Sequence, residues 1–262
     1  MNPILFVSIF LFGLITSGCF TQPAEGQKAN PASNPPVARV PVIVELFTSE
    51  GCSSCPPADR ALKFLADQQP VANAEIIPLA FHVDYWDNLG WKDKFSSAAF
   101  TRRQELYVTR FGIESSYTPE MVVDGRSEFI GNDTGKAAKI IAEAVADRKG
   151  MLTANISGES VTVSVNGLPD HHTSTVFLAV TEDGLTSDVK GGENSGQRFN
   201  HTSVVRSLSA IGVVEKDANI VEAKSSVPTI ADWKRENSRF VVFVQDNISR
   251  KIIAAGVAKL AI

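Results

Sequence analysis

The sequence predicts an α/β domain over residues 40–150, followed by an all-β sandwich domain over residues 151–262. The first domain is predicted because two apolar, β-branched runs flank a segment with helical spacing. The second is predicted because, beyond Gly150, short alternating or apolar segments are separated by Gly, Asn and Asp turns. With 44% hydrophobic residues, the 262-residue chain can bury a sizeable core.

The first elements of the α/β domain form a strand, a helix and a second strand. Residues 40–47 are almost continuously apolar, as expected for a strand buried on both faces, and residues 75–84 repeat this pattern. Between them, Pro56 and Pro57 fit the first turn of a helix that continues to about Gln69. A helix joining two such strands predicts that the strands are parallel neighbours.

The remainder of this domain is predicted to contain a helical insertion, a hairpin and a final helix. An aromatic-rich loop leads into a helix over about residues 93–111. Two short strands then flank an Asp124-Gly125 turn, which is typical of a β-hairpin. A cluster of helix-capping residues at 132–134 precedes the last helical pattern.

Residues 1–19 have the pattern of an export signal. The apolar run over residues 4–15 is too short for a comfortable membrane span, and small residues precede Cys19. This resembles a bacterial lipoprotein signal, in which Cys19 is lipidated; an ordinary secretory signal is the alternative. Residues 20–39 are rich in proline and small polar residues and predict a flexible tether. We therefore expect a lipoprotein on the periplasmic face of the outer membrane, or a periplasmic or secreted protein.

The charge of the chain limits its partners. The formal net charge is -4 and no basic run is present, which argues against nucleic-acid binding. A membrane is expected to be contacted only through the lipid anchor. Exported protein thiols or disulfides, together with an unidentified redox partner, are the expected partners.

Cys52 and Cys55 form a C-x-x-C pair between the first strand and the first helix. A helix N-terminus offers free N–H donors and a positive dipole end, which favour a thiolate. We therefore expect a partly exposed Cys52 to act as the nucleophile and a more buried Cys55 as the resolving thiol. Half of a zinc site is the less favoured reading, because structural zinc needs four ligands and no partner motif follows. A structural disulfide stays open as an alternative.

Thr118-Pro119 opens the predicted hairpin. With the C-x-x-C motif and the order of elements, it resembles the thioredoxin fold over residues 40–150. More closely, the chain resembles a family of exported bacterial proteins catalogued as domain of unknown function 1223. The resemblance implies a thioredoxin-like domain with a dithiol at Cys52 and Cys55, a cis bond at Pro119 and no cofactor. The segments that carry it are "ELFTSEGCSSCPPAD", "HVDYWDNLGWKD", "RQ", "YTPEMVVDG" and "GGENSGQRFNHTSVVR".

Two further residues are candidates for the chemistry of the site. Glu45, in the first strand, could relay protons to the cysteines as a catalytic carboxylate, or be a strand-end carboxylate bonded to the backbone. His82, at the end of the second strand, could complete a Cys2His copper site with Cys52 and Cys55. A hydrogen-bonded structural histidine is the favoured interpretation of His82.

The remaining candidates concern substrate contact. Tyr85 and Trp86 could form an apolar platform for a polypeptide, or fill a joint between parts of the fold. Thr118 would offer backbone groups to an extended substrate. Residues 190–206 form a polar, glycine-rich segment, from which Glu193, Arg198, His201 and Arg206 could face the cysteines. A loop held by its own hydrogen bonds is the favoured interpretation.

Together these features predict an exported thiol–disulfide oxidoreductase-like protein that uses the CSSC dithiol on exported proteins. A periplasmic copper-binding or copper-delivery protein is one alternative. A non-catalytic interaction module with a structural disulfide is the other, so enzymatic activity itself is left open. An oxidising compartment is compatible with all three.

Overall fold

The computed structural model describes residues 38–228 and 232–260, together with Met1. The predictions about the signal segment, Cys19 and nearly all of the tether therefore concern residues outside the described part. Among the described residues, no helix has the length and apolar character that crossing a membrane would require.

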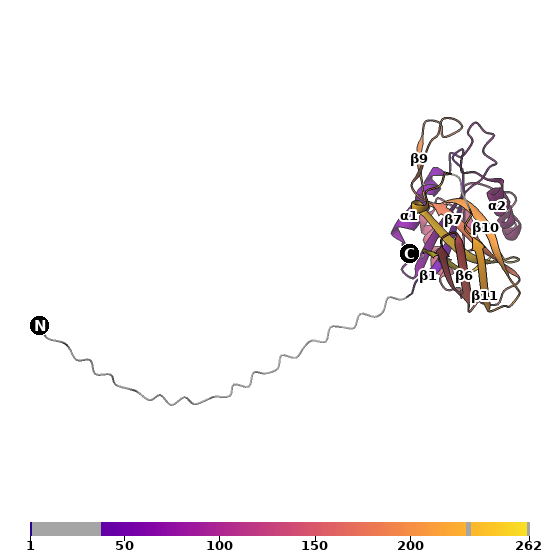
Figure 1. Cartoon of the computed structure of the whole chain (residues 1–262). Coiled ribbons are helices and arrows are strands. Elements are labelled where there is room, and N and C mark those ends of the chain that lie inside the picture. The colour runs from indigo at the N-terminus through magenta and orange to yellow at the C-terminus, as the bar shows by residue number, and fades with distance from the viewer. Residues whose placement is uncertain (2–37, 229–231, 261–262) are drawn as a thin grey trace, which may run out of the picture. The chain divides into compact units, whose positions relative to one another are not determined.

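The described residues form three α-helices and fourteen strands (Figure 1). The helices are α1 (Pro56–Gln68), α2 (Ala98–Phe111) and α3 (Thr134–Ala144), with a 3-10 turn at Arg235–Asn237. The strands are β1 (Val40–Thr48), β2 (Ala74–His82), β3 (Glu120–Val123), β4 (Ser127–Ile130), β5 (Met151–Ser157), β6 (Ser160–Asn166), β7 (Ser174–Glu182), β8 (Leu185–Asp188), β9 (Arg198–His201), β10 (Val204–Val214), β11 (Ile220–Ser226), β12 (Ser238–Asp246), β13 (Ile252–Val257) and β14 (Lys259–Leu260).

The largest sheet is mixed and has eight strands, in the order β13-β12-β7-β10-β2-β1-β3-β4. Within it, β1 and β2 are parallel neighbours from Val40 opposite Ala74 to Thr48 opposite His82, as predicted. A four-stranded sheet has the order β11-β6-β5-β14, and β8 pairs with β9 in a two-stranded sheet.

The predicted fold class, a thioredoxin-like α/β domain followed by a β-sandwich, is wrong. Of the described residues, 41% lie in strands and 19% in helices, and one sheet contains strands from both halves of the chain. The junction lies between β10 and β2, where Val204 pairs with Ala80 and the Ala80 N–H donates to the Ser203 carbonyl at 2.9 Å. This contact joins residues more than a hundred positions apart, so local periodicity could not reveal it.

The helices cover both faces of the large sheet. Val42, Val44 and Leu46 of β1 pack in one core with α1 and α3, whereas Ile43 and Phe47 pack in another with α2. This division follows from the alternation of side chains along a strand. Toward the other end of the sheet, β7 and β12 pack against β5 and β6 in a third core.

Two local predictions can be compared directly with the structure. The β3–β4 hairpin is confirmed, and Asp124 and Gly125 have φ values of 50° and 62°, the left-handed conformation that this turn requires. Helix α2 begins later than predicted, because Ser97 caps it by accepting the Ala99 N–H at 3.2 Å. The proposed domain boundary near residue 150 stays a prediction.

Candidate functional site at the Cys52–Cys55 disulfide

Cys52 and Cys55 are joined by a disulfide, with their Cα atoms 5.4 Å apart. The pair lies in the turn between β1 and α1, and Cys55 immediately precedes the first helical residue. Ser53 and Ser54 are exposed at the tip of the turn, but both cysteines are 0% exposed. The expectation that Cys52 is partly exposed is therefore wrong.

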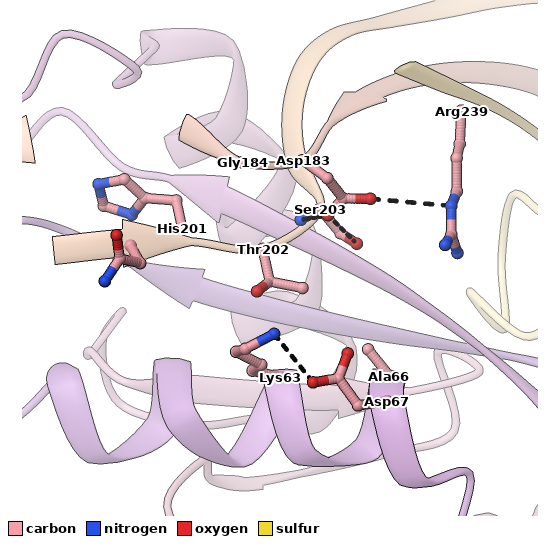
Figure 2. Close-up of a pocket in the computed structure, with 10 residues that line it drawn as sticks. Lys63, Ala66, Asp67, Asp183, Gly184, His201, Thr202, Ser203 and Arg239 are labelled. Carbon is pink, nitrogen blue, oxygen red and sulfur yellow. Dashed lines mark hydrogen bonds and ion pairs between the residues drawn. The ribbon is translucent and has the colours of Figure 1, made fainter. Parts of the chain in front are cut away.

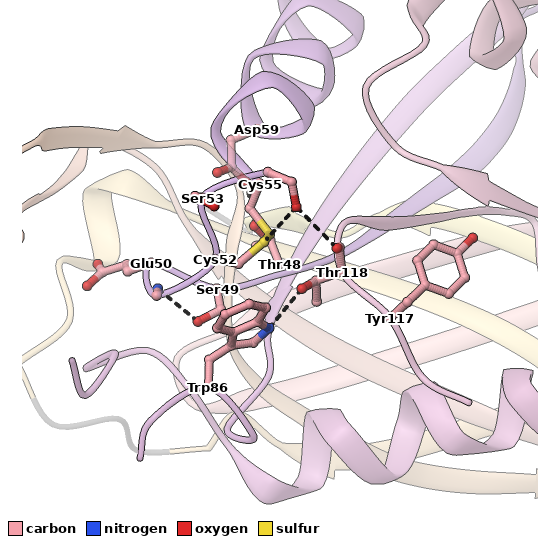
Figure 3. Close-up of a disulfide and its surroundings, with 12 residues drawn as sticks. Thr48, Ser49, Glu50, Cys52, Ser53, Cys55, Asp59, Trp86, Tyr117 and Thr118 are labelled. Carbon is pink, nitrogen blue, oxygen red and sulfur yellow. Dashed lines mark hydrogen bonds between the residues drawn. A yellow bond between two sulfur atoms is a disulfide. The ribbon is translucent and has the colours of Figure 1, made fainter. Parts of the chain in front are cut away.

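Trp86 and Thr118 lie on the side of the disulfide shown in Figure 3, and Ser54 lies against the Cys52 sulfur. The Trp86 indole N–H donates to the Thr118 hydroxyl at 2.9 Å. The Ser54 hydroxyl lies 3.3 Å from the Cys52 sulfur and 3.5 Å from the Thr118 carbonyl, to which it donates. A partner could reach the disulfide only if some of these groups moved. The predicted contact residues Trp86 and Thr118 thus do lie beside the cysteines.

The Thr118–Pro119 peptide bond is cis, the isomer that the resemblance implied, and Pro119 is buried. Helix α2 fixes this segment through Gln104, whose side-chain amide donates at 2.7 Å to the Tyr117 carbonyl and at 2.7 Å to the Glu120 carboxylate. The Tyr85 hydroxyl donates to Gln104 at 3.2 Å. Tyr85 therefore supports the segment that carries the cis bond, and its ring is 37% exposed.

Glu45 is buried on the face of β1 that packs against α2. Its carboxylate accepts hydrogen bonds from Arg103 at 2.5 and 3.0 Å and from the Tyr107 hydroxyl at 2.5 Å. Helix α1, which begins next to Cys55, packs against the opposite face of β1. The structure therefore does not bring the Glu45 carboxylate to the sulfurs, and its use as a proton relay finds no geometric support.

His82 is engaged in a buried ion pair. Its Nδ1 lies 2.6 Å from the Asp93 carboxylate, and the same carboxylate oxygen accepts the Glu50 backbone N–H at 2.9 Å. Burial alone would lower the pKa of His82, but the charge and hydrogen bond of Asp93 raise it above its ordinary value. Likewise, burial alone would raise the pKa of Asp93, and the His82 charge brings it below its ordinary value. Over the described ranges, no three His, Cys, Asp or Glu side chains are grouped to hold a metal ion.

Sequence reasoning missed the partners of Glu50, which lies two residues before Cys52. Its carboxylate accepts the Trp91 indole N–H at 2.7 Å and lies 3.0 Å from the His201 Nε2. Burial alone would raise the pKa of Glu50, but the hydrogen bond with His201 helps to bring it below its ordinary value. Glu50 stands within the C-x-x-C segment, yet nothing in the sequence indicates that a histidine 151 positions away would be its partner.

Asp59, one turn into α1, was also missed. Its carboxylate accepts the Thr48 hydroxyl at 2.9 Å, and both residues lie beside the disulfide in Figure 3. Burial raises the pKa of Asp59 above its ordinary value, although the charge of His82 opposes this. Asp59, His82 and His201 line a cavity of about 10 Å³. An acid and two histidines thus meet next to the helix that begins at the disulfide.

The glycine-rich segment of the second half reaches the disulfide turn, contrary to the favoured interpretation. Glu193 accepts the Ser53 backbone N–H at 3.0 Å, and the Asn194 side chain donates to the carbonyls of Glu50 and Cys52, both at 2.9 Å. Arg198 and Arg206 of this segment pair instead with Asp188 and Glu182. The disulfide turn is therefore held by residues from both halves of the chain.

Charged side chains line the pockets beside α1, and neither cysteine is among the lining residues. The one in Figure 2 has a volume of about 320 Å³ and is lined by Lys63 and Asp67 of α1 and by Asp183 and Arg239. These charges already pair with one another, at 2.8 Å for Lys63 with Asp67 and 3.7 Å for Arg239 with Asp183. The pocket therefore adds no unpaired charge to the site.

A family described as "Protein of unknown function (DUF1223)" matches residues 43–245, which include the disulfide, the cis bond and the Glu193 segment. The chain belongs to this family. No curated protein matches. A solved structure of protein AGR_C_4864 from Agrobacterium tumefaciens is 27% identical with a TM-score of 0.66, covering 84% of this chain and 94% of that one. HBP35 of Porphyromonas gingivalis is 16% identical with a TM-score of 0.52, covering 85% and 76%, and shows a similar fold alone.

Proposed function

We propose that this protein exchanges its Cys52–Cys55 disulfide with the thiols of exported proteins. The observation that carries the proposal is the position of the disulfide, at the start of α1 and beside the cis Thr118–Pro119 bond. The first turn of a helix favours a thiolate, and a thiolate is the reacting species in disulfide exchange. The Ser54 hydroxyl lies 3.3 Å from the Cys52 sulfur and donates to the Thr118 carbonyl in the disulfide form, so it would have to turn to donate to that charge in the reduced form.

The exchange proceeds in two steps. A substrate thiolate attacks the Cys52 sulfur, the Cys52–Cys55 bond breaks, and Cys55 leaves with the electron pair and takes up a proton. A second substrate thiolate then attacks the substrate sulfur of the mixed disulfide and releases Cys52, which also takes up a proton. The substrate dithiol is thereby oxidised to a disulfide and the protein is reduced by two electrons. The reverse sequence reduces a substrate disulfide.

The test is the capture of partners in cells. In a Cys55→Ser variant, Cys52 has no resolving thiol, so exported partners should accumulate as mixed disulfides that reducing agent releases. The matched Cys52→Ser variant should capture none, because in the proposed exchange Cys52 is the sulfur that forms the mixed disulfide. Equal capture by both variants, or capture by neither, would contradict the proposal.

The cis bond gives a second test. Pro119→Thr places an N–H and a hydroxyl near the sulfurs, and it should slow release of substrate from the Cys55→Ser complex or change which partners are captured. Circular dichroism should show an unchanged fold. Unaltered partners and release rates in a folded variant would mean that Pro119 has no part in the exchange.

A structural disulfide in a non-catalytic interaction module is the second candidate. One observation favours it: both cysteines are 0% exposed, and Asn194 donates to the Cys52 carbonyl from a distant loop. A structural disulfide resists the glutathione pool, whereas an exchanging one equilibrates with it. Incubating the folded protein in glutathione buffers separates the two, because only the exchanging pair should become reduced without unfolding.

Copper binding needs a separate test, on the reduced protein. The structure holds His82 on Asp93 and joins the cysteines to each other, so copper would have to displace an ion pair of 2.6 Å. Stoichiometric binding of copper to the reduced protein that is lost in His82→Ala would favour the copper interpretation over exchange.

We also propose export as a lipoprotein, on the sequence pattern before Cys19. A lipid on Cys19 would hold the protein at the outer membrane of a Gram-negative cell. A Cys19→Ala variant should then appear in the soluble fraction. Its retention in the membrane fraction would show that lipid attached to Cys19 is not the anchor.

A further inference from the structure

The segment between β8 and β9 docks closely on the turn that holds the disulfide and on the aromatic loop beside it. A Cβ atom on Gly191 would lie 2.3 Å from the Gly90 carbonyl oxygen, which no side chain tolerates. Gly192 has a φ of 68°, and its Cβ would lie 3.2 Å from the Cβ of Trp91. Asn194, two residues after Gly192, is 1% exposed. Glycines thus let the segment reach the disulfide turn.

Docking brings the Glu193 carboxylate to the backbone N–H of Ser53, at 3.0 Å. Ser53 directly follows Cys52, so this N–H is one of the donors that could stabilise a negative charge on the Cys52 sulfur. The carboxylate already occupies it. The Cys55 N–H is also in use, because it donates to the Cys52 carbonyl at 3.2 Å. Two backbone donors of the turn are therefore unavailable to a thiolate.

The charge on Glu193 is also uncompensated. The other acids of the site lie beside histidines: Glu50 is paired with His201, and the charge of His82 acts on Asp59. Glu193 makes no ion pair within 4.0 Å among the residues that the structure describes. The hydrogen bonds from Ser53 hold the pKa of the Glu193 carboxyl below its ordinary value, so it is ionised at neutral pH.

We propose that Glu193 is a positioning residue that restrains the exchange reaction of Cys52. Its carboxylate takes the Ser53 N–H and places a negative charge on the backbone directly after Cys52, so the reduced protein keeps Cys52 as a thiol. A disulfide becomes a weaker oxidant when its reduced form lacks thiolate stabilisation. Glu193 therefore sets how readily the disulfide accepts electrons. This inference rests on the proposed function.

The experiment compares Glu193→Gln with the native residue in the full chain, carrying Cys19→Ser so that Cys52 and Cys55 are the only thiols. Glutamine keeps an oxygen for the Ser53 N–H and removes only the charge. In the reduced protein, thiolate absorbance and alkylation rate against pH give the pH at which Cys52 is half ionised. We expect this pH to fall by up to about one unit in Glu193→Gln, since Glu193 is exposed and solvent screens part of its charge. The equilibrium with glutathione should shift toward the reduced protein.

The matched control is Glu75→Gln, which removes an exposed carboxylate at the start of β2. It should leave the ionisation of Cys52 unchanged. Ser54→Ala, which removes the hydroxyl donor, should shift the ionisation in the opposite direction, to higher pH. An unchanged or raised value in Glu193→Gln would overturn the inference, even if Cys55→Ser captures partners. Conversely, a lowered value without any captured partner would leave Glu193 in its role and contradict exchange.

Discussion

The two sides of strand β1 hold two different buried polar clusters. On the α2 side lies the Arg103 cluster, which we define as Glu45, Arg103, Tyr107 and Gln245. Around the turn after β1 lies the histidine cluster, defined as Glu50, Asp59, His82, Asp93 and His201. The first contains a permanent cation, whereas the second contains two histidines, a residue type whose charge depends on pH.

The two clusters differ in where the hydrogen bonds of their carboxylates go. Both carboxylate oxygens of Glu45 are bonded to Arg103, and Gln245 also accepts from Arg103 at 3.2 Å. In the histidine cluster, by contrast, one carboxylate oxygen of Asp93 contacts His82 and also accepts the Glu50 backbone N–H of the disulfide turn. The Arg103 cluster is therefore suited to fixing structure, and the histidine cluster couples the charge of buried groups to the site.

Breaking the Arg103 cluster should have the largest effect. Arg103→Met leaves the Glu45 carboxylate buried, at 0% exposure, without its cation. Removing one partner of a buried pair costs about 3–5 kcal/mol, so denaturant unfolding should show a loss of that size. The double variant with Glu45→Gln should recover part of the loss, because it also removes the stranded charge. A loss below about 1 kcal/mol in the single variant would mean that water already reaches this cluster.

The histidine cluster should instead show its contribution in the pH profile. The pKa of His82 is raised above 6.5, so its contribution is full below pH 6.5 and is lost as pH rises through the folded value. The pKa of Asp93 is lowered below 3.8, so its contribution is full above pH 3.8 and is lost as pH falls. The His82–Asp93 pair should therefore stabilise the folded state most between pH 3.8 and pH 6.5. In His82→Gln, the loss of unfolding free energy between pH 6 and 9 should shrink by about 1 kcal/mol.

The control for this profile is His172→Gln, because His172 is 52% exposed although it also meets a carboxylate. It should leave the profile nearly unchanged. Part of the decline between pH 6 and about 7 should persist in both variants, since burial raises the pKa of Glu120 from 4.5 to about 7 and stability is lost as pH rises between these values. An identical profile in the native chain and His82→Gln would show that the pair does not couple pH to stability.

The comparison also explains what the sequence could predict. The β1–α1–β2 unit and the β3–β4 hairpin follow from local periodicity and turn chemistry, and both are confirmed. The fold class was wrong because the pairing of β10 with β2 joins segments whose separation carries no local signal. At the site, the cysteine pair is visible in the sequence, and Glu193 and His201 could be named as candidates to face it. Their partners, Ser53 and Glu50, lie more than 130 residues away and could not be derived from a local pattern.

Removing the charge of Asp59 should change the free energy of unfolding least among these variants. Its folded pKa is raised by burial, so the folded state loses stability as pH rises past 3.8 and the carboxyl ionises. Asp59→Asn keeps an oxygen for the Thr48 hydroxyl, which donates at 2.9 Å, and removes the charge. At pH 8 the variant should be more stable than the native chain by about 1 kcal/mol or less, since the residue is partly exposed, and near pH 3 the two should be equal. Denaturant unfolding at both pH values measures the difference.

A gain at pH 8 would show that the disulfide side keeps a carboxylate at a cost in stability, unlike the α2 side. A loss would place Asp59 with Glu45, as a carboxylate whose partners make its charge favourable.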